Sequence, residues 1–114
     1  MAIVRQKLSA STNGRNVKVT GTNTAGAVTI HTADATALDQ VTLFAVNTSA
    51  STVTLTIEWG GTTSPDDLVV VDLPANSGDR TIVDGRVLTG GLLVEAFAST
   101  ASVVTINGFV DRIT

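Results

Sequence analysis

Hydrophobic and polar residues alternate without exception between Thr52 and Trp59. This pattern predicts a β-strand with one face toward the core and one toward solvent, as in antiparallel sheets. The preceding stretch, Val41–Val46, is apolar on both faces except at Thr42, which predicts a more central strand. The polar segment Asn47–Ser51 between them is typical of a hairpin loop. The residues expected on the apolar face of the 52–59 strand are Val53, Leu55, Ile57 and Trp59.

Further short strands are separated by turns rich in Gly, Pro, Asn, Asp and Ser. Their spacing predicts an all-β fold, an antiparallel β-sandwich of about eight strands that is jelly-roll-like and has no significant helix. Asp84-Gly85 is expected to be a turn between two strands, and Ala33–Gln40 a loop or one helical turn. The other predicted strands are Ile3–Leu8, Val17–Thr20, Ala27–Thr32, Leu68–Leu73, Arg80–Val83, Arg86–Leu88, Leu92–Phe97 and Val103–Arg112.

Size and composition agree with one small domain that has a hydrophobic core. The chain has 114 residues, of which 43% are hydrophobic and 15% charged, and it has no cysteine. Disulfides and thiolate chemistry are therefore excluded. We expect residues 21–114 to form the sandwich, and residues 1–20 to be either an extended basic arm or its first strands. The residues predicted to be buried are Val53, Leu55, Ile57, Phe97 and Ile106.

The two kinds of charge are unequally distributed along the chain. All ten acidic residues lie from Asp34 onward, whereas four basic residues precede the first acid. An extended basic segment could be steered to an acidic partner surface, and its apolar residues could enter a groove or add a strand to a sheet edge. The net charge of −3 argues against nucleic-acid binding. The partner-binding residues predicted on this basis are Ile3, Val4, Arg5, Lys7, Arg15 and Lys18.

No stretch of the sequence indicates a leader peptide or a membrane partner. Residues 1–8 lack a long apolar run and a cleavage pattern, so we expect no signal peptide. No segment approaches the roughly 20 apolar residues of a membrane-spanning helix.

Candidate chemistry is sparse. His31 is the single histidine, and it lies in a predicted strand without a nucleophile motif beside it, so we interpret it as a residue of the polar strand face. Zinc would require several His or Cys ligands. Asp66-Asp67 could contribute to a calcium loop but lacks the dense acidic spacing of one, which favours a simple turn.

The remaining motifs are equally unspecific. Gly60-Gly61 and Gly90-Gly91 do not open a helix and have no following Lys-Ser/Thr pair, so they are not phosphate loops. Aromatic residues make up only 4% of the chain, which argues against a glycoside-hydrolase cleft and weakens a sugar-binding module. We therefore predict no catalytic residues, no cofactor and no metal, and a protein that is not an enzyme.

From Val41 to Ile113 the chain resembles small β-sandwich virion proteins of tailed bacteriophages, of the decoration or accessory type. The similarity lies in the residue types of short segments and in their order along the chain. It covers about two-thirds of the chain and includes no catalytic motif. It is carried by Asn47-Thr48-Ser49, the run Val53–Thr63, Leu73-Pro74-Ala75, Val87-Leu88, Ala96-Phe97-Ala98 and Ile106–Val110.

This resemblance implies a structural role in a virion that is assembled in a bacterial host cytoplasm. The expected function is that of a capsid decoration (cement) protein, which binds the major capsid protein or another virion subunit. The resemblance also implies a homo-oligomer, with a trimer as the expected state. Two alternatives remain, namely another virion part such as a neck, tail or fibre-associated subunit, and a soluble carbohydrate-binding or adhesin-type module.

Overall fold

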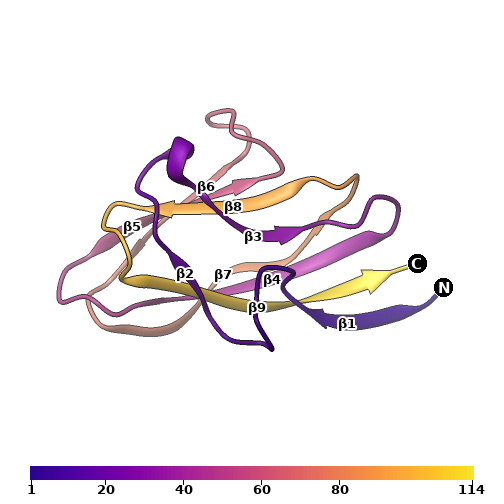
Figure 1. Cartoon of the computed structure of the whole chain (residues 1–114), viewed down its shortest axis with the longest axis horizontal. Helices are drawn as coiled ribbons and strands as arrows, with labels where there is room; N and C mark the ends of the chain where they lie inside the picture. Colours follow the sequence, from indigo (N-terminus) through magenta and orange to yellow (C-terminus); the bar gives the residue numbers. More distant parts are fainter.

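The computed structural model describes all 114 residues and folds them into two antiparallel β-sheets that pack face to face (Figure 1). Nine strands and one short 3₁₀ helix, η1 (Thr24–Gly26), make up the chain. Sheet 1 contains, in spatial order, β1 (Ile3–Lys7), β9 (Val104–Ile113), β4 (Leu38–Asn47) and β7 (Ser77–Leu88), and β2 (Val17–Val19) also pairs with β9. Sheet 2 contains β3 (Val28–Thr32), β8 (Leu93–Ala98), β5 (Val53–Trp59) and β6 (Leu68–Leu73).

The strand order is that of a jelly roll. From β2 to β4 the chain changes sheet at every step, β5 and β6 form a hairpin in sheet 2, and β7, β8 and β9 alternate again. Two interleaved four-stranded sheets of this kind define the jelly roll. The predicted all-β, antiparallel β-sandwich is therefore confirmed, with β1 as an additional strand at the edge of sheet 1.

Alternation along β5 places its apolar side chains between the sheets. Val53, Leu55 and Ile57 are fully buried, as is Ile106 on β9, so these four predictions are correct. Phe97 was predicted wrongly, because its neighbours Ala96 and Ala98 occupy the inward positions of β8 and leave Phe97 half-buried on the outer face. The core as a whole consists of 19 buried aliphatic side chains from both sheets.

Two other local predictions differ from the structure. β7 runs without interruption through Asp84-Gly85, because Gly85 adopts a positive φ of 70° and the register with β4 shifts beside it, so the extra residue is absorbed as a bulge. The stretch predicted as a loop or helical turn is a loop up to Ala37, after which β4 begins. Within this loop the Asp34 carboxylate accepts hydrogen bonds from the backbone N–H groups of Thr36 and Ala37.

The N-terminal residues belong to the sandwich. β1 and β2 pair with successive parts of the same side of β9, and the connection between them crosses to the edge of sheet 2. There the N–H of Ala10 donates to the carbonyl of Ile30 at 3.2 Å, and the side chain of Leu8 is fully buried in the core. Residues 3–7 and 17–19 are therefore strands of sheet 1.

Candidate functional site

Strand β1 places the predicted apolar contact residues at the outer edge of sheet 1. β1 pairs only with β9, so its other side is free. Ile3 and Val4 are 60% and 53% exposed, which is high for large apolar side chains. Because successive strand residues point to opposite faces, Ile3, Arg5 and Lys7 share the outer face of the sheet, whereas Val4 lies on the other face. The edge of β1 therefore combines a free backbone with exposed apolar and cationic side chains.

Of the two cations of β1, one forms an ion pair within the chain and the other does not. Arg5 forms a two-pronged ion pair with Asp111 of β9, with 2.9 Å from Nε to Oδ1 and 3.1 Å from Nη2 to Oδ2. Its guanidinium also lies 4.1 Å from the centre of the Phe109 ring. The hydrogen bond from Arg5 lowers the pKa of Asp111 from its usual value. Lys7 is exposed and forms no ion pair, so it is the free cation of this strand.

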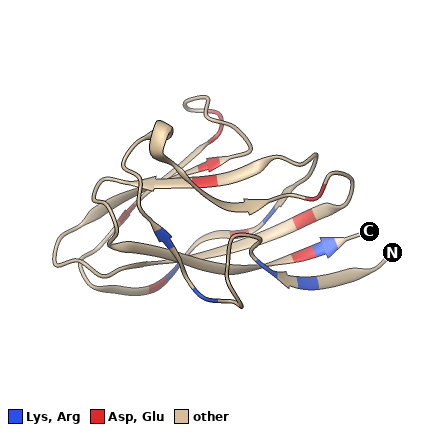
Figure 2. Ribbon diagram, in the orientation of Figure 1, with Lys and Arg blue, Asp and Glu red and all other residues tan.

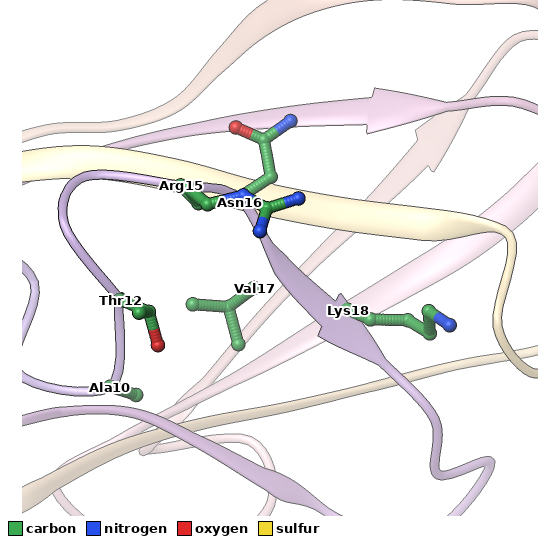
Figure 3. Close-up of a pocket in the computed structure, with 6 residues that line it drawn as sticks. All are labelled: Ala10, Thr12, Arg15, Asn16, Val17 and Lys18. Carbon is green, nitrogen blue, oxygen red and sulfur yellow. The ribbon is translucent and has the colours of Figure 1, made fainter.

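The other two predicted residues, Arg15 and Lys18, line a hollow at the start of β2 (Figure 3). Arg15 and Lys18 both contribute to it, and neither forms an ion pair within the chain. A pair of unpaired cations beside amide and hydroxyl groups is suited to an anionic group such as a carboxylate or a phosphate. The hollow has a volume of about 590 Å³ and is lined by Ala10, Thr12, Arg15, Asn16, Val17 and Lys18.

The loop that carries the hollow is fastened to β9 by polar contacts. Asn107 of β9 donates from Nδ2 to the carbonyl of Gly14 at 3.0 Å and to Oδ1 of Asn16 at 2.9 Å. Asn16 in turn donates from Nδ2 to the hydroxyl of Thr105 at 3.2 Å. These bonds hold the loop in a defined position, so that the cations are presented by a supported surface. The structure thus brings Arg15 and Lys18 together, and Ile3, Val4, Arg5 and Lys7 form a separate group on β1.

A buried polar cluster connects the two sheets near the chain termini. His31 of β3 lies 2.8 Å from Asp39 of β4, measured from Nε2 to Oδ2, and both side chains are buried. Arg112 of β9 donates to the same carboxylate at 2.8 Å from Nε and 3.0 Å from Nη2. A further hydrogen bond comes from the backbone N–H of Asp34 at 3.1 Å. Burial opposes the charge of Asp39, but the hydrogen bonds from Arg112 and His31 outweigh it and lower its pKa to about 2.

The interpretation of His31 as a residue of the polar strand face is wrong. The register between β3 and β8 shifts between Thr29 and His31, and as a result both Ile30 and His31 are buried. Nδ1 of His31 accepts the backbone N–H of Ser9 at 3.1 Å, which leaves Nε2 as the donor to Asp39. The hydroxyl of Ser9 instead accepts from the N–H of Thr32 at 2.7 Å. His31 therefore joins the N-terminal segment to β4 through a backbone group and a carboxylate, and no serine hydroxyl is hydrogen-bonded to it.

Glu58 is the other buried ionisable side chain. It lies on the outer face of β5 and is covered by η1, whose Thr24 hydroxyl donates to Oε2 at 3.1 Å. Oε1 has no hydrogen-bond partner. No group of three or more His, Cys, Asp or Glu side chains is arranged to hold a metal ion. At the turn considered for calcium, the Asp67 carboxylate accepts the backbone N–H of Thr63 at 3.1 Å, which is local turn chemistry.

Sequence reasoning missed Asp39 and Arg112, although one signal was present. In an alternating strand Asp39 shares its face with Val41, Leu43 and Ala45, so the pattern places a carboxylate toward the core. A buried carboxylate requires a cationic or hydrogen-bonding partner. The partner could not be named, because Arg112 is 73 residues away in sequence.

Comparison with protein-family models, curated proteins and solved structures gives no match. No helix of this fold has the length and apolar character needed to cross a membrane.

Proposed function

We propose that this protein is a non-catalytic virion structural protein, a capsid decoration protein that binds and stabilises a phage head lattice. In this proposal its partners are the major capsid protein, or another virion subunit, and further copies of itself. It is assembled into the particle in the bacterial host cytoplasm. The resemblance implies a trimer for the self-association.

The observation that carries this proposal is the unsatisfied basic surface at the N-terminal side of the sandwich. Lys7, Arg15 and Lys18 have no acidic partner in the chain, although ten acidic residues are available. The loop that lines the hollow together with Arg15 and Lys18 is held by hydrogen bonds to β9, so little order has to be gained on binding. This surface would accept an acidic segment of a neighbouring virion subunit.

The aromatic side chains give less support to a carbohydrate-binding module. Sugar sites usually present an open aromatic ring, whereas Trp59 is half-buried beneath Arg86, whose guanidinium lies 5.0 Å from the ring centre. Phe44 and Phe109 are half-buried and pack against each other at 6.3 Å between centres. A neck, tail or fibre position in the virion would use the same basic surface, and copy number in the particle distinguishes it from the capsid.

The proposal is tested with particles produced from the genome that encodes the chain. We expect mass spectrometry to detect the protein in purified particles, at a copy number that matches the capsid lattice. Stripped particles should bind the added wild-type protein and lose binding to the double variant Arg15→Glu/Lys18→Glu. The matched control is Arg80→Glu, which reverses an exposed arginine without an ion pair on β7. Absence of the protein from the particles, or equal binding of both variants, would contradict the proposal.

A further inference from the structure

The edge strands of the two sheets differ in how well their free backbone groups are protected. An unpaired edge exposes N–H and C=O groups that can pair with another chain, and proteins usually cover, charge, shorten or distort such edges. β3 is covered, because the carbonyl of Ile30 accepts from the N–H of Ala10 and the N–H of Thr32 donates to the Ser9 hydroxyl. The edge of β3 is therefore closed by the chain itself.

Two further edges are protected by other means. β7 is distorted by three register shifts relative to β4, and it carries charges of both signs at Asp79, Arg80, Asp84 and Arg86. β2 is only three residues long and includes Lys18. Distortion, charge and short length each discourage pairing with another strand. Only β6 in sheet 2 and β1 in sheet 1 remain to be considered.

β6 is an open, regular and apolar edge. The backbone N–H of Trp59 donates to the carbonyl of Asp67 at 2.7 Å, which fixes the alternation of hydrogen bonds along the β5–β6 ladder. Because bonded and non-bonded pairs alternate in an antiparallel ladder, the backbone groups of Leu68, Val70 and Asp72 point away from β5. The register has no shift, and Val70 is 59% exposed. The N–H of Leu68 already donates to the carbonyl of Pro65 at 3.3 Å, whereas the outward N–H and C=O groups of Val70 and Asp72 are free. β6 therefore offers two complete residues and the Leu68 carbonyl for pairing, in a register without a bulge.

β1 is the second open edge. Ala2 and Thr114 exchange both backbone hydrogen bonds, at 3.1 and 2.9 Å, so the bonded pairs of the β1–β9 ladder include Val4 and Gln6. The backbone groups of Ile3, Arg5 and Lys7 consequently point away from β9. Like β6, this strand presents three outward residues in a regular register.

The two open edges carry opposite charge. The turn before β6 and the strand itself contain Asp66, Asp67 and Asp72 and no basic residue. β1 contains no acid and two cations, of which Arg5 is paired with Asp111 of β9 and Lys7 is free. Figure 2 shows acidic residues in the turn between β5 and β6 and basic residues on β1. Two β6 edges would bring acids of both copies together, but a β6 edge and a β1 edge attract each other. The segment that follows β1 contacts β3, and β3 and β6 are the two opposite edges of sheet 2. β1 and β6 therefore lie on opposite sides of the sandwich.

We propose that β6 of one copy pairs with β1 of a second copy, so that copies assemble head to tail by strand addition. An antiparallel arrangement with Arg5 opposite Val70 aligns the outward residues of the two strands, and Leu68 takes part through its carbonyl because its N–H is bonded to Pro65. It places Ile3 opposite Asp72 and Lys7 opposite Leu68, and it brings the exposed Val4 beside Val71 of the other copy. A contact between two different surfaces of the same chain forms a closed ring when its rotation permits. This inference rests on the proposed self-association and specifies its surface.

Proline variants test the pairing, because proline removes one N–H and is tolerated where that N–H faces away from the sheet. Val70→Pro removes an outward donor of β6, and Ile3→Pro removes one of β1. At a concentration where the wild type is oligomeric by light scattering, we expect each variant to be monomeric. An equimolar mixture should form a complex of two chains, because Val70→Pro retains an intact β1 edge and Ile3→Pro retains an intact β6 edge.

A second pair of variants keeps the test independent of proline. Val70→Lys should also yield monomers, whereas Val87→Lys, at an exposed position of the protected β7 edge, should keep the wild-type mass. Circular dichroism and thermal melting verify that each variant is folded.

Three results would overturn the inference. If Ile3→Pro still associates while Val70→Pro does not, β6 pairs with β6 and the head-to-tail contact is wrong. If Val70→Pro and Val70→Lys, both folded, keep the wild-type mass, the edge is not used, although the proposed binding to particles is unaffected. A wild type that is monomeric up to its solubility limit overturns both this contact and the proposed homo-oligomer.

Discussion

The most consequential single residue is Asp39, a carboxylate with no exposed surface in a sandwich core. Four donor groups surround it, from His31, Arg112 and the backbone of Asp34. Removing one partner from a buried charged cluster leaves another group unpaired, which costs more than the cluster itself contributes. Asp39 thus fixes how β3, β4 and β9 meet at the end of the molecule that holds both termini.

Replacing this carboxylate should destabilise the fold strongly. We expect Asp39→Ala to lower the free energy of unfolding by about 3–5 kcal/mol, because Arg112 and His31 lose their common acceptor. Urea denaturation at pH 7 measures the loss. The matched control is Asp84→Ala, an exposed aspartate of β7 without a hydrogen-bonded side chain, for which we expect a change below about 0.5 kcal/mol. Similar losses for both variants would mean that the Asp39 cluster is not formed.

The same residue predicts how stability depends on pH. The pKa of Asp39 is lowered from 3.8 in its ordinary state to about 2 in the fold, so the folded protein favours the ionised carboxylate. This stabilisation is present above pH 4 and is lost as the pH falls toward 2, at roughly 1.4 kcal/mol per unit of pKa difference. Urea midpoints measured from pH 7 to pH 2 should fall in that window. Asp39→Asn should remove most of this fall, and a wild-type curve that stays level would contradict the assignment.

At the scale of the elements, alternation predicts strands well and their irregularities poorly. β5 keeps the predicted alternation of its apolar side chains toward the core, because both of its neighbours pair with it in regular registers. Its outer face is less exposed than the pattern predicts, since Thr56 and Glu58 are buried. The bulge in β3 that buries His31 and the bulge in β7 at Gly85 depend on the partner strands, which local sequence does not contain. Phe97 shows the related limit that an aromatic residue can occupy the outer face when alanines fill the inner one.

The candidate site shows the same division between local and distant information. The structure places the basic residues that precede the first acid around a hollow and along an open edge, and their role in partner binding stays a prediction. The ion pair between Arg5 and Asp111 joins residues 106 positions apart, so no local pattern could show that this cation is already satisfied. Whether a charged side chain is free or paired can therefore be determined only from the folded structure.

The N-terminal segment should behave as an element of the sandwich, because Leu8 is fully buried beside β3. We expect Leu8→Ala to reduce the free energy of unfolding by about 2–5 kcal/mol, the range for truncating a buried leucine. Leu92→Ala, at a half-exposed leucine of the loop before β8, is the control and should cost less than about 1 kcal/mol. Chemical denaturation compares the two variants. If Leu8→Ala is no more destabilising than Leu92→Ala, the segment is not docked in solution as it is in the structure.

At the scale of the whole molecule, charges that hold the fold together are separate from charges that are free to bind a partner. The Asp39 cluster is buried, and salt screens buried pairs weakly. Lys7, Arg15 and Lys18 are exposed and have no partner in the chain. Salt should therefore act on association and leave folding nearly unchanged.

This separation leads to a prediction for binding and stability measured in the same buffers. Screening shortens the range of exposed charges to about 10 Å at 0.1 M salt and about 3 Å at 1 M. Binding to particles should therefore weaken severalfold as sodium chloride rises through this range, while the melting temperature shifts by only a few degrees. Lys18→Glu should bind more weakly at low salt and respond less to added salt, whereas Arg80→Glu should follow the wild type. Binding that strengthens with salt would indicate that apolar contacts of Ile3 and Val4 dominate, because exposed ion pairs cannot gain from screening.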